Sequence, residues 1–115
     1  IKEITFNPDK MLEMCNKGHI NATDVADSLV ADLGVPFRDA HMITGKLVAI
    51  ADRKKIQIHE LNIKDFKKVD KRISKNIVNK ITLEASVKNR DSYGGTSPEN
   101  IKKEIIFSKE KWCND

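Results

Sequence analysis

The sequence predicts an all-α fold: a small domain of short helical hairpins (helix-turn-helix units) with a C-terminal helix. Apolar residues recur at the three- and four-residue spacing of one helix face through most of the chain. Capping residues precede these stretches, and glycine or proline separates them. The alternation of apolar and polar residues at 56–59 is too short for a paired strand, so we expect an extended connector there.

Composition and length favour one globular domain over residues 1–115. The chain is 39% hydrophobic and 33% charged, and no apolar run approaches the roughly 20 residues that cross a bilayer, so we expect no membrane partner. Two widely spaced cysteines, Cys15 and Cys113, favour a reducing, cytoplasmic location over a disulfide-rich secreted one. Because the chain begins with Ile1 and shows no apolar signal segment, we expect it to be part of a longer protein.

The ends of the first two expected helices are marked by punctuating residues. Asn7 and Pro8 open the first, and Gly18 is expected to close it in a left-handed conformation. Thr23 is expected to cap the second helix through its side-chain oxygen, and Gly34 to stop it.

The third expected helix is the longest and begins at Pro36 after a very short turn. It ends in the basic residues 53–55, whose charge complements the helix dipole. Residues 23–55 should therefore form a helix–tight turn–helix unit. The apolar stripe of the third helix comprises Phe37, Ala40, Ile43, Leu47, Ile50 and Ala51.

Shorter helices are expected after Asn62 and Ser74 and from Thr82 or Leu83, and the last helix after Ser97 with Pro98 in its first turn. Ile101, Ile105 and Trp112 should share one face of that last helix. We expect core packing for Met11, Met14 and Trp112, with a surface covered by further polypeptide as the alternative.

No motif predicts catalysis within this chain, and no catalytic residue is assigned. His19, His41 and His59 lack the i, i+4 spacing of a helical metal clamp, so no metal site is expected. His41 is expected to be an interface or half-buried residue rather than a base. The Gly94-Gly95 turn precedes a helix but lacks phosphate-loop spacing, so we interpret it as a tight backbone turn rather than a ligand-binding loop.

The formal net charge is +4, and much of the excess lies in one basic stretch. Asp65 and Asp70 interrupt this stretch and Phe66 is its one aromatic residue, which favours a solvated helix face over a nucleic-acid surface. Its basic members are Lys64, Lys67, Lys68, Lys71, Arg72, Lys75 and Lys80.

The alternative function is a stand-alone helical module that contacts nucleic acid through the basic stretch or through the helix–turn–helix at 23–55. The second helix carries Asp24, Asp27 and Asp32, which would repel phosphates. We therefore expect no nucleic-acid partner.

Several strings match a known family in order and spacing across nearly the whole chain. They are 7–13, 21–27, 34–41, 45–48 and 86–99, and the match is weakest from Ile56 to Leu83. The strings resemble the C-terminal region of argininosuccinate lyase, in the fumarase/aspartase superfamily. The motif residues that carry the resemblance are Pro36, Phe37, Arg38, His41, Gly45, Arg90, Tyr93, Gly94, Gly95, Thr96 and Ser97.

The resemblance implies a helical, homotetrameric enzyme of arginine biosynthesis that reversibly splits argininosuccinate into arginine and fumarate, with no metal or organic cofactor. In the family, active sites are assembled from three subunits, and the catalytic serine lies in a Gly-Ser-Ser-x-Met-Pro-x-Lys-x-Asn loop that this sequence lacks. We therefore expect a non-catalytic domain, inactive alone, whose partners are the remainder of the lyase chain and the other subunits of the tetramer. Some family members are inactive lens crystallins, and the sequence leaves that role open for the parent protein.

Overall fold

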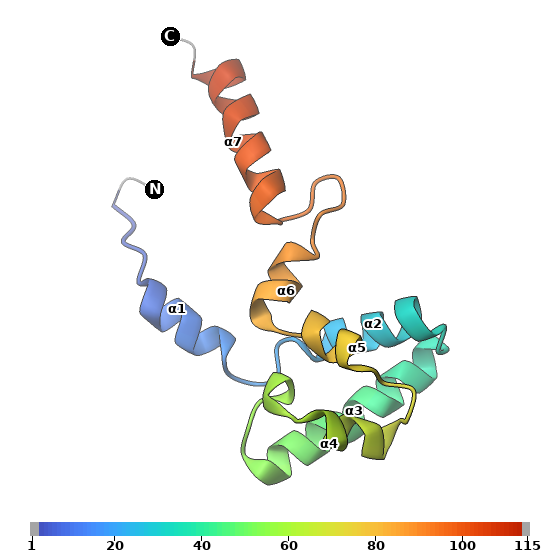
Figure 1. Cartoon of the computed structure of the whole chain (residues 1–115). Helices are drawn as coiled ribbons and strands as arrows, with labels where there is room; N and C mark the ends of the chain where they lie inside the picture. Colours follow the sequence, from blue (N-terminus) through green and yellow to red (C-terminus); the bar gives the residue numbers. More distant parts are fainter. Residues whose placement is uncertain (1–2, 114–115) are drawn as a thin grey trace. The chain divides into compact units, whose positions relative to one another are not determined.

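The computed structural model describes residues 3–113, and all regular structure within this range is helical (Figure 1). The predicted all-α class is thus confirmed. The chain divides between Ile81 and Thr82 into two compact units. The first contains α1 (Pro8–Cys15), α2 (Ala22–Leu33), α3 (Phe37–Lys54), the 3-10 helix η1 (Ile58–Glu60), α4 (Ile63–Val69) and α5 (Lys75–Lys80); the second contains α6 (Leu83–Lys88) and α7 (Pro98–Trp112).

The α2–α3 hairpin is the framework of the first unit, as the sequence predicts. Gly34 ends α2 with a φ of 62°, a left-handed conformation that glycine adopts without steric cost. The amides of Gly34 and Val35 donate to the carbonyls of Val30 and Leu29, at 3.1 and 3.3 Å. The turn therefore reverses the chain within three residues and sets α2 against α3.

α3 lies at the centre of this unit and packs against α2, α4 and η1. Four members of its predicted stripe are buried and Ile50 is partly buried, but Phe37 is 63% exposed, so its core assignment is wrong. Val35, in the preceding turn, is buried instead. The largest fully buried side chains of the core are Phe66, Leu29, Leu47, Ile58, Ile73, Ile81, Val25 and Val35.

Helix starts follow the predicted caps in most cases. Asn62, Thr82 and Ser97 each accept a hydrogen bond from the backbone N–H three residues on, at 3.0, 3.2 and 3.3 Å. Asn7 does the same for α1 at 3.0 Å. Ser74 precedes α5 without a side-chain capping bond.

The predicted cap at Thr23 is wrong, because α2 begins at Ala22 and Asn21 occupies the cap position. The Asn21 side chain is buried and makes no capping bond; its amide donates to the Ile81 carbonyl. A buried amide needs a partner, and this one is 60 residues away along the chain.

Two further local expectations differ from the structure. Residues 58–60 form η1 rather than an extended connector, because the Glu60 carboxylate accepts from the Gln57 amide at 2.6 Å while Ile58 is fully buried. Helix α1 ends at Cys15, and Gly18 adopts its left-handed φ of 73° two residues beyond the Asn16 C-cap.

The expected core packing of Met11, Met14 and Trp112 is wrong, because these side chains are 55%, 56% and 72% exposed. Neither α1 nor α7 contains a buried residue. Ile101, Ile105 and Trp112 do share one face of α7, where they line a shallow groove of about 340 Å³.

A buried carboxylate joins α3 to α4. Asp65 is 2% exposed, and one of its oxygens lies 2.6 Å from the Lys54 Nζ on α3; the other lies 3.8 Å from Lys68. The hydrogen bond from Lys54 lowers the pKa of Asp65 below its ordinary value, although burial opposes this shift. The pair therefore helps to hold α4 on α3.

Replacing the core side chain of Leu47 should strongly destabilise the protein. We expect Leu47→Ala to lower the free energy of unfolding by about 2–5 kcal/mol, because it removes a fully buried side chain and leaves a cavity. Leu12→Ala, at a side chain that is 59% exposed, is the matched control and should have a small effect. Urea unfolding followed by circular dichroism measures both, and equal losses would contradict this core.

The charge on Asp65 should make stability depend on acid pH. Because its pKa is lowered in the folded state, Asp65 stabilises the fold above its unfolded pKa of about 4, and this contribution is lost as the pH falls through the folded value. Asp65→Asn should therefore lower the urea midpoint at neutral pH and flatten its decline in acid. The exposed Asp27→Asn serves as the control. An acid decline in Asp65→Asn as steep as in the wild type would exclude this role.

Candidate functional site

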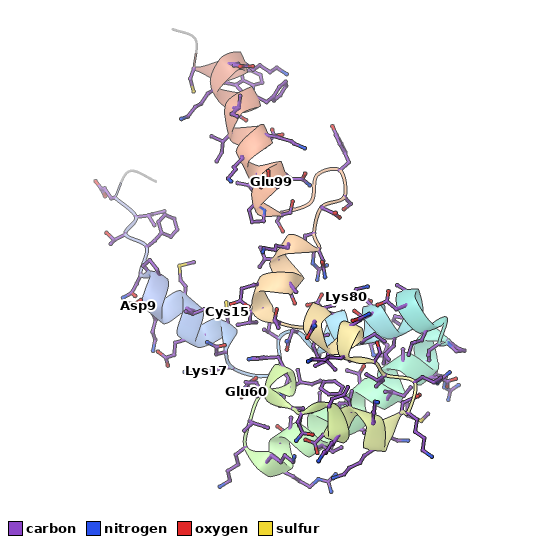
Figure 2. The ribbon with its side chains drawn as sticks, in the orientation of Figure 1. Asp9, Cys15, Lys17, Glu60, Lys80 and Glu99 are labelled. Carbon is purple, nitrogen blue, oxygen red and sulfur yellow. The ribbon has the colours of Figure 1, made fainter. Side chains whose placement is uncertain are left out.

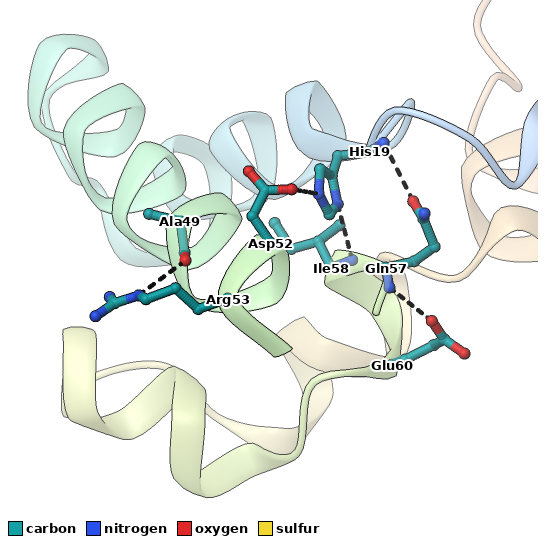
Figure 3. A network of polar contacts seen from close by, with 7 residues as sticks. All are labelled: His19, Ala49, Asp52, Arg53, Gln57, Ile58 and Glu60. Carbon is teal, nitrogen blue, oxygen red and sulfur yellow. Dashed lines mark hydrogen bonds and ion pairs between the residues drawn. The ribbon is translucent and has the colours of Figure 1, made fainter. Parts of the chain in front are cut away.

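A polar cluster around His19 joins the segment between α1 and α2 to the end of α3 and to η1 (Figure 3). The His19 Nε2 lies 2.9 Å from the Asp52 carboxylate, and its Nδ1 accepts from the Ile58 N–H at 3.1 Å. The His19 backbone N–H donates to the Gln57 side chain at 3.2 Å. One residue thus ties together three segments of the first unit.

This arrangement determines the proton position on the His19 ring. Because Nδ1 accepts from a backbone N–H, the proton lies on Nε2, which donates to the Asp52 carboxylate. A His–Asp pair of this kind orients the base in many hydrolases, but there the second ring nitrogen is free to take a proton. Here that nitrogen is occupied by Ile58. The chemistry of the cluster is therefore structural, and the ring acts as a cross-link.

The motif residues of the α2–α3 hairpin lie at the beginning of α3 and on its exposed side. Pro36 occupies the N-cap position. The rings of Phe37 and His41 meet edge to face with centroids 4.4 Å apart. His41 is exposed, so the half-buried alternative is wrong, and its interface role stays a prediction. Arg38 and Gly45 are also exposed.

The motif residues of the second unit form a tight loop before α7. The Gly95 N–H donates to the Ser92 carbonyl at 2.8 Å, and the Ser97 N–H donates to the Arg90 carbonyl at 2.9 Å. A Cβ at Gly95 would lie 2.2 Å from the Arg90 oxygen, which only glycine avoids. Gly94, with a φ of 76°, makes the preceding bend.

The side chains of this loop have different surroundings. Ser97 is buried and caps α7, whereas Tyr93 and Thr96 are exposed. The Asn100 side-chain amide donates to the Ser92 carbonyl at 2.7 Å and so fastens the loop to the first turn of α7. That turn also contains Glu99, which suits the positive end of the helix dipole (Figure 2).

Part of the basic stretch is neutralised within the first unit. Arg72 lies 2.7 Å from Asp70 and Lys80 lies 2.8 Å from Asp32, in addition to the Lys54–Asp65–Lys68 group. The Arg72 hydrogen bond lowers the pKa of Asp70. This pairing agrees with a solvated, salt-bridged helix surface.

Within residues 3–113, no three His, Cys, Asp or Glu side chains gather as a metal site would require. Across the same range, none of the helices has the length and apolar character needed to span a bilayer. Cys15 and Cys113 are both exposed free thiols.

Comparison with known proteins assigns the chain to a protein family. The family model described as "Argininosuccinate lyase C-terminal" matches residues 19–88, which extend from His19 through α6. The chain belongs to the argininosuccinate lyase C-terminal family. The expected resemblance is thus confirmed, and it covers the whole hairpin framework. Helices α1 and α7 lie outside the matched range.

Relatives of this lyase family extend the likeness over nearly the whole chain. "Argininosuccinate lyase 1" of Mesorhizobium japonicum is 38% identical over 111 residues, which cover 96% of this chain and 24% of the relative. "Argininosuccinate lyase" of Nitratiruptor sp. is 41% identical over 107 residues, which cover 93% of this chain and 23% of the relative. The chain therefore spans about a quarter of the length of these lyases.

The sequence does not predict the partners of His19. Asp52 and Gln57 lie 33 and 38 residues away from it, so no short spacing joins them. The sequence near His19 gives one indication of its role: His19 directly follows Gly18, in the break between α1 and α2. A histidine with a positive φ, here 52°, is uncommon and marks a constrained position.

Substitution of Gly95 should disrupt the loop before α7. We expect Gly95→Ala to speed amide hydrogen exchange about tenfold or more at residue 95 and its neighbours and at Ser97. The added Cβ would displace the Arg90 carbonyl, which accepts the hydrogen bond of the Ser97 amide. Gly45→Ala is the matched control, since a Cβ there meets nothing within 4 Å. Equal exchange in wild type and Gly95→Ala, measured by NMR, would contradict the described geometry.

Proposed function

We propose that this chain is the non-catalytic C-terminal domain of an argininosuccinate lyase. The parent would be a cytoplasmic enzyme of arginine biosynthesis that reversibly cleaves argininosuccinate to arginine and fumarate. The 115 residues would act as one domain that supports a homotetrameric catalytic body. Membership of the C-terminal family and the two named lyases support this proposal.

The observation that carries the supporting role is the exposure of α7. This helix has 15 residues and none is buried. Burying a large apolar side chain stabilises a protein by about 1.5–3 kcal/mol, so a helix of this composition is expected to be covered in the complete protein. The apolar side chains concerned are Ile101, Ile105, Ile106, Phe107 and Trp112, which are 43–72% exposed.

The proposed non-catalytic role is supported by what elimination requires. The reaction needs a base beside the acidic proton and donors aimed at the developing negative charge. His19 is held by Ile58 and Asp52, and its second ring nitrogen is not available as a base. The domain would therefore contribute packing, while proton transfer occurs on other segments of the lyase.

Fumarate release separates the two parts of this proposal. We expect no turnover above background by the 115-residue chain, even at high protein concentration, and turnover by a full-length lyase that contains it. Enzyme-like turnover by the chain alone would exclude the non-catalytic role, and an inactive full-length protein would exclude the enzymatic assignment.

The packing role has its own readout. In the full-length protein, Ile105→Gln should lower the thermal unfolding midpoint by several degrees, because it places an amide in a covered apolar face. Lys103→Gln, which is also exposed on α7, is the control. Equal midpoints for both variants would exclude α7 as a packing surface.

A further inference from the structure

Helix α3 has an apolar face that its own unit does not cover. At 100° per residue, its buried residues Ala40, Ile43, Thr44, Leu47 and Ala51 lie on one side, and Arg38, Met42, Gly45 and Ala49 lie on the opposite side. All four of the latter are exposed, and Met42 is 54% exposed. A surface helix normally presents polar residues opposite its core stripe. Three of these four positions are apolar or lack a side chain.

Gly45 is the most informative residue of this outward face. Glycine in a helix interior costs about 1 kcal/mol relative to alanine. The described structure offers no compensation, because Gly45 has no left-handed φ and an added Cβ would meet nothing within 4 Å. Glycine at an exposed helical position allows another backbone to approach closely. The open space at Gly45, between Met42 and Ala49 on this face, thus leaves room for a crossing helix.

The size of the face decides what kind of occupant it can hold. From Arg38 to Ala49 it extends about 16 Å at the helical rise, and with a width of about 10 Å it offers roughly 160 Å². An independent complex needs about 800 Å² from each partner. A segment of the same chain has a high effective concentration and needs far less contact. Because this chain spans only 23–24% of its lyase relatives, such a protein contains ample further polypeptide.

The charges around the face indicate the chemistry of its occupant. Arg38 lies at one end of the face, and Lys46 and Arg53 border it; the Arg53 Nε donates to the Ala49 carbonyl at 3.1 Å (Figure 3). Asp52, at one edge, is already paired with His19. A helix with an apolar ridge and flanking carboxylates would complement this border.

From these observations we infer that the outward face of α3 docks such a helix from the remaining lyase chain, which crosses α3 at Gly45. This inference rests on the proposed function, because it assumes that the domain belongs to a longer lyase. It adds a specific surface, distinct from α7, and a specific contact residue.

The test compares Gly45→Leu in the full-length lyase with the same change in the 115-residue chain. In the chain alone, the thermal midpoint should stay the same or rise, because leucine is a better helix former and meets no neighbour. In the full-length protein, the midpoint should fall by several degrees, and hydrogen exchange across residues 38–49 should accelerate about tenfold. Ala31→Leu, at an exposed alanine on α2, is the control and should change neither.

Three results would overturn the inference. The first is a full-length Gly45→Leu protein that behaves like Ala31→Leu. The second is an equal loss of stability in the isolated chain, which would assign Gly45 to packing within the unit. The third is dimerisation of the isolated chain that Gly45→Leu abolishes, which would make a second copy the occupant. Fumarate release by the unmodified full-length protein tests the proposed function separately, so either idea can fail alone.

Discussion

The packing of α3 against α2 is the constraint on which the rest of the first unit depends. The left-handed Gly34 reverses the chain so sharply that Val35 enters the core and the two helices meet along their apolar stripes. Once α3 is placed, α4 and η1 have a surface to pack on, and α5 packs against α2. Short helices of six or seven residues are not stable alone, so α4 and α5 depend on this surface.

Polar contacts between distant segments add to the small apolar core in joining the elements of the first unit. Lys54 with Asp65 joins α3 to α4, the His19 ring joins the preceding segment to Asp52 and Ile58, and the Asn21 amide reaches Ile81. Each places a polar group where water is largely excluded, and each is satisfied by a partner from a distant part of the chain. These contacts specify which turn lies beside which helix, in addition to any energy that they contribute.

The same features are consistent with the proposed supporting role. Its histidine–aspartate pair is used for cross-linking, and its glycine loop before α7 is closed by backbone hydrogen bonds at Gly95 and Ser97. Its exposed large apolar side chains, by contrast, are most numerous on α7 and α1. Exposed apolar faces of this kind are typical of surfaces that pack against further polypeptide.

The sequence by itself determined the helices, most of their caps and the family, because these depend on residues within a few positions of one another. Asn7, Asn62, Thr82 and Ser97 act over three residues, and Gly34 acts on its own backbone. Tertiary structure decided the rest. It buried Val35 in place of Phe37, used Asn21 for a contact 60 residues away and gave His19 its partners. The reason is physical. A capping residue bonds to the backbone of its own helix turn, whereas burial and cross-linking depend on residues that are distant in the sequence and become neighbours only in the folded chain.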